Sequence, residues 1–228
     1  MSIEWRVISI GVPDANELRE ERAPVRTGHA TTTLIRADDK TIIVDPGLPG
    51  QVLEARLRER AGIEPGEVTH VFLTSFRPDV RRGLDLFEQA DWFVSERERE
   101  AVGVPLVASY RDAEEEGEKD LQAALELDIA ILQRCLPAPD ALAEQISLFP
   151  LAGVSPGLTG LVIAEPRFTV LIAGDAIPTV EHLEQGKIPK NAMDIEQARE
   201  SFADAVEIAD LMILGRDNVV VNPTKRPF

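Results

Sequence analysis

Polar and charged side chains able to do chemistry lie in short loops that follow apolar, strand-like segments. They are Ser75, Arg77, Asp79, Asp175 and Arg216. Carboxylates can transfer protons or bind a metal ion, and a serine hydroxyl becomes a nucleophile when a base lies beside it. Because binding and catalytic residues concentrate in loops held by a rigid scaffold, we expect these loops to form one site.

A serine nucleophile at Ser75 would need a base close by. The nearest histidine in the sequence, His70, lies five residues earlier along the same predicted strand. Its side chain is expected on the opposite face, because side chains alternate between the two faces of a strand. We therefore do not expect Ser75 to act as a nucleophile.

The elements that must position these loops fall into two groups of strands. Apolar and β-branched runs predict strands at Trp5–Val12, Thr31–Arg36, Lys40–Asp45, Thr69–Thr74, Trp92–Val94, Ile146–Phe149, Leu161–Ala164, Thr169–Ala173 and Leu211–Leu214. Polar turns within each group predict hairpins. Two groups of strands, each accompanied by helices, favour two mixed sheets packed together with helices outside.

Helical spacing of apolar residues predicts the accompanying helices. They are expected at Gln51–Ala61, Arg81–Ala90, from Ser95 onward, at Ala113–Leu136 and at Ile195–Ala209. Ser95 is a suitable N-cap, and Glu98 stands three residues later, as in a capping box. We expect a single domain over residues 1–228, with a helical insertion at about 111–140.

Five loops carry a resemblance to a known family. They contain Asp45-Pro46-Gly47, Ser75-Phe76-Arg77-Pro78-Asp79-Val80, Pro156-Gly157-Leu158-Thr159, Gly174-Asp175 and Gly215-Arg216. In this order and at these separations, the chain from about Thr31 to Asp217 resembles the metallo-β-lactamase superfamily of mostly zinc-dependent hydrolases. The resemblance implies an α+β fold, a four-layer αββα sandwich of two mixed β-sheets flanked by helices.

The positions that match the family's metal ligands have largely changed. The family motif His-x-His-x-Asp-His falls on residues 75–80, and the next histidine falls in the Pro-Gly-His-Thr-like loop. The matching residues here are Ser75, Arg77, Asp79, Val80, Leu158, Asp175 and Arg216. All five histidines of the pattern are replaced, and only the two aspartates, Asp79 and Asp175, remain.

This replacement changes the chemistry that the site can support. Zinc in hydrolytic sites takes nitrogen or sulfur ligands, whereas two carboxylates and a hydroxyl suit magnesium better. We therefore expect no cofactor. The alternative is a divalent zinc, iron, manganese or magnesium ion held by Asp79 and Asp175. Our hypothesis is that Arg77 and Arg216 fill the former metal space and pair with the two aspartates. If Arg77 is buried there, Arg77→Ala should lower the free energy of unfolding by about 3 to 5 kcal/mol.

Three further residues are expected at the edge of this pocket. Asp45 matches a family aspartate that supports the site from behind, although a turn with Pro46-Gly47 explains it equally well. His182 lies in a segment that in family members commonly lines the pocket, and His29 precedes a strand that leads toward the same rim.

The composition limits the choice of partners. The chain has 24 basic and 40 acidic side chains, a formal net charge of -16, so we expect no affinity for nucleic acid or anionic membranes. One cysteine cannot form an internal disulfide, and no long apolar run is present, which favours a cytoplasmic protein. A small-molecule ligand and a homo-oligomer are the partners that we consider.

Two functions remain open from the sequence. The first is a pseudoenzyme, a metallo-β-lactamase-fold protein that has lost its dinuclear zinc site and acts as a binding, regulatory or assembly protein. The second is a hydrolase of a small ester, lactone or thioester with a non-standard metal site around Asp79 and Asp175.

Overall fold

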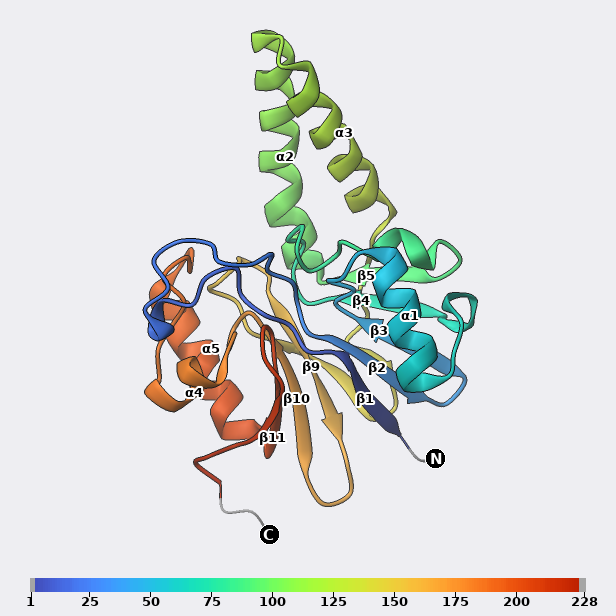
Figure 1. The fold of residues 1–228 in the computed structure, drawn as a ribbon, viewed down its shortest axis with the longest axis vertical. Coiled ribbons are helices and arrows are strands. Elements are labelled where there is room, and N and C mark those ends of the chain that lie inside the picture. Colours follow the sequence, from blue (N-terminus) through green and yellow to red (C-terminus); the bar gives the residue numbers. More distant parts are fainter. Residues whose placement is uncertain (1–2, 226–228) are drawn as a thin grey trace.

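Two six-stranded β-sheets lie face to face at the centre of the computed structural model, which describes residues 3–225 (Figure 1). The first sheet has the order β1-β2-β3-β4-β5-β6 and the second β12-β11-β10-β9-β8-β7. Each sheet contains parallel and antiparallel pairs: β3, β4, β5 and β6 pair in parallel, as do β10 and β11. The expected α+β fold of two mixed sheets is confirmed.

The strand bounds follow the predicted runs closely in most cases. The first sheet contains β1 (Glu4–Ser9), β2 (Thr32–Ala37), β3 (Lys40–Val44), β4 (His70–Leu73), β5 (Asp91–Val94) and β6 (Leu136–Pro137). The second contains β7 (Ala141–Ala143), β8 (Ile146–Pro150), β9 (Thr159–Ala164), β10 (Thr169–Gly174), β11 (Leu211–Leu214) and β12 (Val219–Val221).

Alternating side chains divide the interior into three layers of core. In β4, Phe72 packs between the two sheets, while Val71 and Leu73 face the helices of the first sheet. In β10, Ile172 packs between the sheets and Leu171 faces the helices of the second. Strands that are apolar on both faces are thus covered on both sides, which holds their carboxyl ends, and the loops that follow, in fixed positions.

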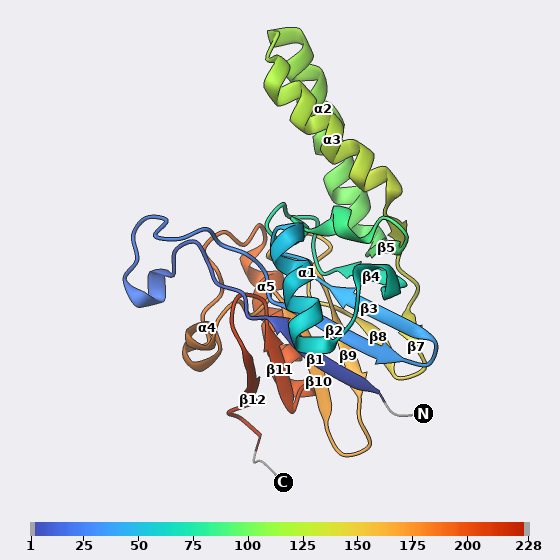
Figure 2. The ribbon, with the colours of Figure 1, turned by 45° about the vertical axis from the view of Figure 1, so that its right-hand side comes forward.

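Helices cover the outer face of each sheet. On the first sheet lies α1 (Gly50–Ala61), and on the second lie α4 (Val180–Gln185) and α5 (Ile195–Ile208) (Figures 1 and 2). The helix expected over residues 81–90 is wrong: the structure has only a short 3-10 helix, Leu84–Phe87. The Gly83 amide donates to the Pro46 carbonyl, and a side chain at Gly83 would collide with the Leu48 carbonyl, so this segment follows the neighbouring loop closely.

A hairpin of two helices stands away from the sheets (Figures 1 and 2). It consists of α2 (Glu96–Glu116) and α3 (Lys119–Arg134). The helix expected over residues 113–136 is confirmed for most of its length by α3, but its start is wrong, because Gly117 takes a left-handed conformation with φ 73° and ends α2 inside that range. We expected the insertion at about 111–140, and the hairpin begins earlier, at the first turn of α2.

The base of this hairpin is tied to two loops by Glu98, whose side chain is buried. Its carboxylate accepts hydrogen bonds from the Phe76 amide (3.0 Å), the Gly157 amide (3.0 Å) and the Ser155 hydroxyl (2.8 Å). Ser95 caps α2 as predicted, accepting from the Glu98 amide. The prediction of a capping box is wrong, because the Glu98 carboxylate points to the two loops and does not accept from the Ser95 amide.

Removing this carboxylate should loosen both loops. We expect Glu98→Ala to lower the free energy of unfolding by about 3 kcal/mol, because two buried backbone N–H groups lose their acceptor. Urea denaturation measures the change, and Glu115→Ala, on the exposed end of α2, is the matched control. Equal stability of the two variants would contradict the prediction.

Candidate functional site

One guanidinium group lies between two carboxylates at the carboxyl ends of the strands. Asp79 follows β4 of the first sheet, whereas Asp175 and Arg216 follow β10 and β11 of the second. Arg216 donates from Nε to Asp175 Oδ1 at 2.7 Å and from Nη2 to Asp175 Oδ2 at 2.6 Å. Its Nη1 donates to Asp79 Oδ2 at 2.6 Å. Arg216 is 5% exposed, so this is a buried, bidentate contact extended to a second carboxylate.

Arg77 lies on the solvent side of Asp79 and Asp175. Its Nε is 3.5 Å from Asp79 Oδ1 and 3.7 Å from Asp175 Oδ2. The side chain is 38% exposed, so the burial that we considered for Arg77 is wrong, and the large stability effect attached to it does not apply. We call Arg77, Asp79, Asp175 and Arg216 the arginine–carboxylate cluster.

The four formal charges of the cluster sum to zero, and they shift the pKa values of Asp175 and Arg216. Burial alone would raise the pKa of Asp175, but the charge and hydrogen bonds of Arg216, with the charge of Arg77, hold that pKa below its usual value. Burial would likewise lower the pKa of Arg216, but the two carboxylates raise it. Asp175 and Arg216 are therefore both charged at neutral pH.

Tight backbone packing brings Asp175 and Arg216 together. Gly174 has φ 54°, and a side chain at Gly215 would lie 2.4 Å from the Gly174 carbonyl oxygen. The Gly215 amide donates to the Ile177 carbonyl, and the Arg216 amide to the Pro178 carbonyl at 2.7 Å. Glycine before each charged residue is thus required by the close approach of the two loops.

Asp45 lies behind the cluster and is fully enclosed. Its two oxygens accept from the Thr74 amide at 2.8 Å and the Thr74 hydroxyl at 2.7 Å. Burial raises the pKa of Asp45 to about 7, against the opposing effect of these hydrogen bonds. The residue also has φ 52°, which makes the sharp turn into Pro46-Gly47. Asp45 therefore holds the end of β4 in place through Thr74.

Three of the sequence candidates are buried away from open space. Ser75, Val80 and Leu158 are enclosed side chains, packed beneath the loops that carry the cluster. Within the part of the chain that the structure describes, the Ser75 hydroxyl has no hydrogen-bond partner. None of the three can contact a ligand in this conformation.

A cavity of about 390 Å³ opens onto the cluster. All four cluster residues line it, together with His182, Asn16, Glu17 and Lys190. The last three were missed from the sequence: Asn16 and Glu17 lie in the segment between β1 and β2, which has no periodic pattern, and Lys190 follows α4. Glu17 and Lys190 form an ion pair, and the Asn16 amide nitrogen donates to the Thr179 hydroxyl at 3.3 Å.

The two rim histidines differ in their placement. His182 lines the cavity, and its Nδ1 lies 2.9 Å from the Thr179 hydroxyl. His29 pairs with Val12 through its backbone and is not among the cavity's lining residues. Burial lowers the pKa of both imidazoles, so both are neutral at pH 7. Of the two, only His182 is positioned to contact a ligand in the cavity.

Residues 3–225 contain neither a metal-binding group of side chains nor a helix suited to span a membrane. No group of three or more His, Cys, Asp or Glu side chains among these residues is arranged to hold a metal ion. No helix in the same range is both long and apolar enough to cross a bilayer.

The sequence matches one family over most of its length. The family model described as the metallo-beta-lactamase superfamily matches residues 25–214. A search of the curated proteins finds no match.

Several solved structures share the fold at low sequence identity. A Thermotoga maritima protein described as a candidate metallo-β-lactamase is 19% identical, with 97% of this chain and 100% of that chain covered and a TM-score of 0.69. AidC, a dizinc quorum-quenching lactonase, is 18% identical over 99% of this chain and 89% of its own, with a TM-score of 0.67. An N-acyl homoserine lactone hydrolase is 18% identical over 90% and 87%, with a TM-score of 0.61.

The two arginines of the cluster should differ sharply in their effect on stability. Arg216→Ala leaves two carboxylates without their buried partner and should lower the free energy of unfolding by about 3 to 5 kcal/mol. Arg77→Ala, which removes a partly exposed and more distant charge, should cost at most about 1 kcal/mol. Chemical denaturation of both variants measures the difference. Similar losses would show that Arg216 is not the dominant partner.

Asp45 should give the protein a distinctive pH dependence. Its pKa rises from 3.8 in the unfolded chain to about 7 on folding, so the folded state binds more protons between these values. Protonation of Asp45 therefore stabilises the folded state at low pH. As the pH rises from about 4 to 7, this stabilisation is lost, and the free energy of unfolding falls by about 4 kcal/mol. Asp45→Asn should remove this part of the slope. Denaturation curves of both proteins across that pH range make the comparison, and parallel profiles would contradict it.

Proposed function

We propose that this chain, which belongs to the metallo-β-lactamase superfamily, is a binding protein in which the arginine–carboxylate cluster has replaced metal-dependent hydrolysis. The observation that carries the proposal is the placement of Arg216. Its three hydrogen bonds engage Asp79 and Asp175, the two aspartates at positions that match family metal ligands. A guanidinium group thus supplies the positive charge that a metal ion would otherwise bring.

The residues around the cluster do not suit a dinuclear zinc centre. Zinc takes nitrogen or sulfur ligands in most protein sites, and the corresponding positions hold Ser75, Arg77, Val80, Leu158 and Arg216. Two guanidinium groups would repel an added cation at this distance. The donor set therefore supports loss of the metal site, and no catalytic step is derived through a metal.

The cavity supports a role in binding a small molecule. Its volume of about 390 Å³ is within the usual range of small-ligand sites. It offers the partly exposed Arg77 guanidinium and the neutral His182 imidazole as polar contacts. A regulatory or assembly role would follow if ligand binding changed how the chain meets a partner. The net charge of -16 favours a small molecule or a protein over nucleic acid.

The alternative is a hydrolase of a small ester, lactone or thioester with a non-standard metal site. It is favoured by the fold shared with the lactonase AidC and with the N-acyl homoserine lactone hydrolase. Such an enzyme would have to bind metal through Asp79 and Asp175 after Arg216 had moved away. We also propose a cytoplasmic location, which the single buried thiol of Cys135 supports.

Metal content separates the two functions. We expect protein purified without chelator from zinc-, iron- and manganese-containing medium to hold far less than one metal ion per chain by plasma mass spectrometry. Asp175→Asn should give the same background value, as should Asp91→Asn, an exposed control. Stoichiometric metal that is lost only in Asp175→Asn, together with hydrolysis in a panel of esters, lactones and thioesters, would establish the alternative.

A further inference from the structure

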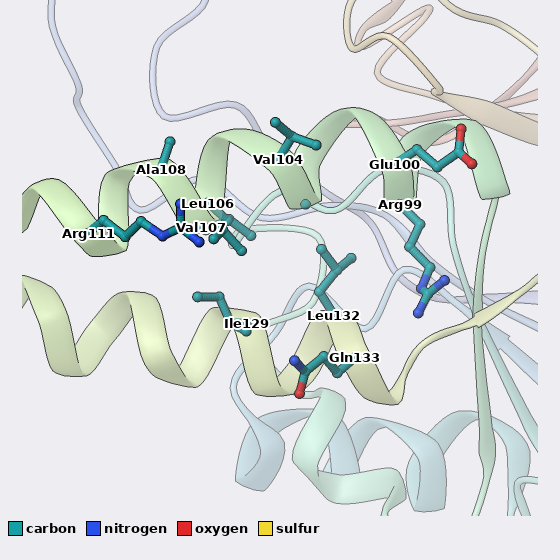
Figure 3. Close-up of a pocket in the computed structure, with 11 residues that line it drawn as sticks. Arg99, Glu100, Val104, Leu106, Val107, Ala108, Arg111, Ile129, Leu132 and Gln133 are labelled. Atoms are coloured by element: carbon teal, nitrogen blue, oxygen red, sulfur yellow. The ribbon is translucent and has the colours of Figure 1, made fainter.

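The helical hairpin carries an apolar groove that nothing in residues 3–225 covers. The groove, about 540 Å³, runs along α2 and is lined by Gly103, Val104, Leu106 and Val107, with Ile129 and Leu132 from α3 (Figure 3). Val104 is 76% exposed and Val107 40%. Figure 3 shows Val104 directed away from α3, whereas Leu132 reaches toward α2. The hairpin therefore presents apolar side chains well away from the sheets.

The exposed face of α2 has a pattern that reads the same in both directions. Its members are Glu100, Gly103, Val104, Val107, Ala108 and Arg111. The spacing of 3, 1, 3, 1 and 3 residues places them along one helical face. Apolar residues occupy the middle, small residues flank them, and opposite charges stand at the two ends. If a second α2 ran antiparallel to the first, apolar residues would face apolar residues, small residues would face small residues, and each terminal charge would face its opposite.

We propose that the groove is occupied by a second copy of this chain, with the two α2 helices packed antiparallel about a two-fold axis between Val104 and Val107. Val104 of each copy then meets Val107 of the other, and Gly103 lies beside Ala108. The small residues allow close approach of the helices. Glu100 of each copy faces Arg111 of the other, so the pairing adds two ion pairs. This surface is independent of the cluster and of the proposed ligand.

The charges of Glu100 and Arg111 favour a second copy of the chain in the groove, with its α2 antiparallel to the first. Within the described residues, neither Glu100 nor Arg111 forms an ion pair, although both line the groove. A parallel pairing would oppose Glu100 to Glu100 and Arg111 to Arg111, and would bring together the two acidic ends at 114–118. The same surface patch on both subunits is the defining property of a two-fold interface. A seam of this length is in the class of small interfaces, so we expect a dimer of modest affinity.

The oligomeric state tests the surface. Sedimentation of the full chain from about 1 to 200 µM should show a monomer–dimer equilibrium. Val104→Glu combined with Val107→Glu should abolish the dimer while circular dichroism keeps the helical signal. Val52→Glu, on the exposed face of α1, should leave association unchanged. A monomer at every concentration, or a dimer that persists in the double glutamate variant, would overturn the proposal.

A charge exchange tests the direction and register. Glu100→Arg alone, or Arg111→Glu alone, should weaken the dimer about tenfold because like charges then face each other twice. The two changes together should restore association to within about twofold of the original. A partner of another kind, or a parallel pair of helices, would give no such restoration. Failure of the double exchange to recover the dimer would refute the antiparallel arrangement.

Discussion

The contact of one buried guanidinium group with two carboxylates joins the two halves of this fold. Arg216 and Asp175 belong to loops of the second sheet, and Asp79 to a loop of the first. The two sheets also meet through apolar side chains and through backbone hydrogen bonds, from the Thr159 amide to the Thr74 carbonyl and from the Thr31 amide to the Gly215 carbonyl. Directed, charge-assisted hydrogen bonds fix the position of the strand ends relative to each other. The mouth of the cavity depends on this contact, because the residues that make it also line the cavity.

The net charge of the arginine–carboxylate cluster differs from that of the chain as a whole. The protein carries a net charge of -16, yet the cluster itself is neutral. Two carboxylates brought together in a protein interior must be neutralised by protonation, by a metal ion or by a basic side chain. This chain contains arginine at two of the relevant positions. Asp45, which has no such partner, is the group whose pKa burial raises to about 7.

Much of the fold could be predicted from the sequence because alternation in the strands reflects burial directly. Strand alternation within Thr69–Thr74 puts Val71 and Leu73 on one face and Phe72 on the other, and the structure has this arrangement. The co-location of Arg216 with both aspartates was expected from the resemblance to the family, because these residues match its metal-ligand positions. The exposure of Arg77 could not be predicted, because it depends on the paths of loops far apart in the sequence. Asn16 and Glu17 lie in a segment without periodicity, and they reach the cavity only through tertiary contacts.

At Glu98, hydrogen bonds to loops distant in the sequence take the place of the capping box that the local sequence predicts. A capping box would have satisfied the first turn of α2, but two buried amides and a hydroxyl in neighbouring loops needed an acceptor. Because one rigid carboxylate serves α2 and both loops, α2 cannot slide along its axis while those hydrogen bonds remain intact. Glu98 therefore anchors the base of the hairpin to both loops. A force applied at the far end of the hairpin would be transmitted to the loop that holds Arg77 and Asp79.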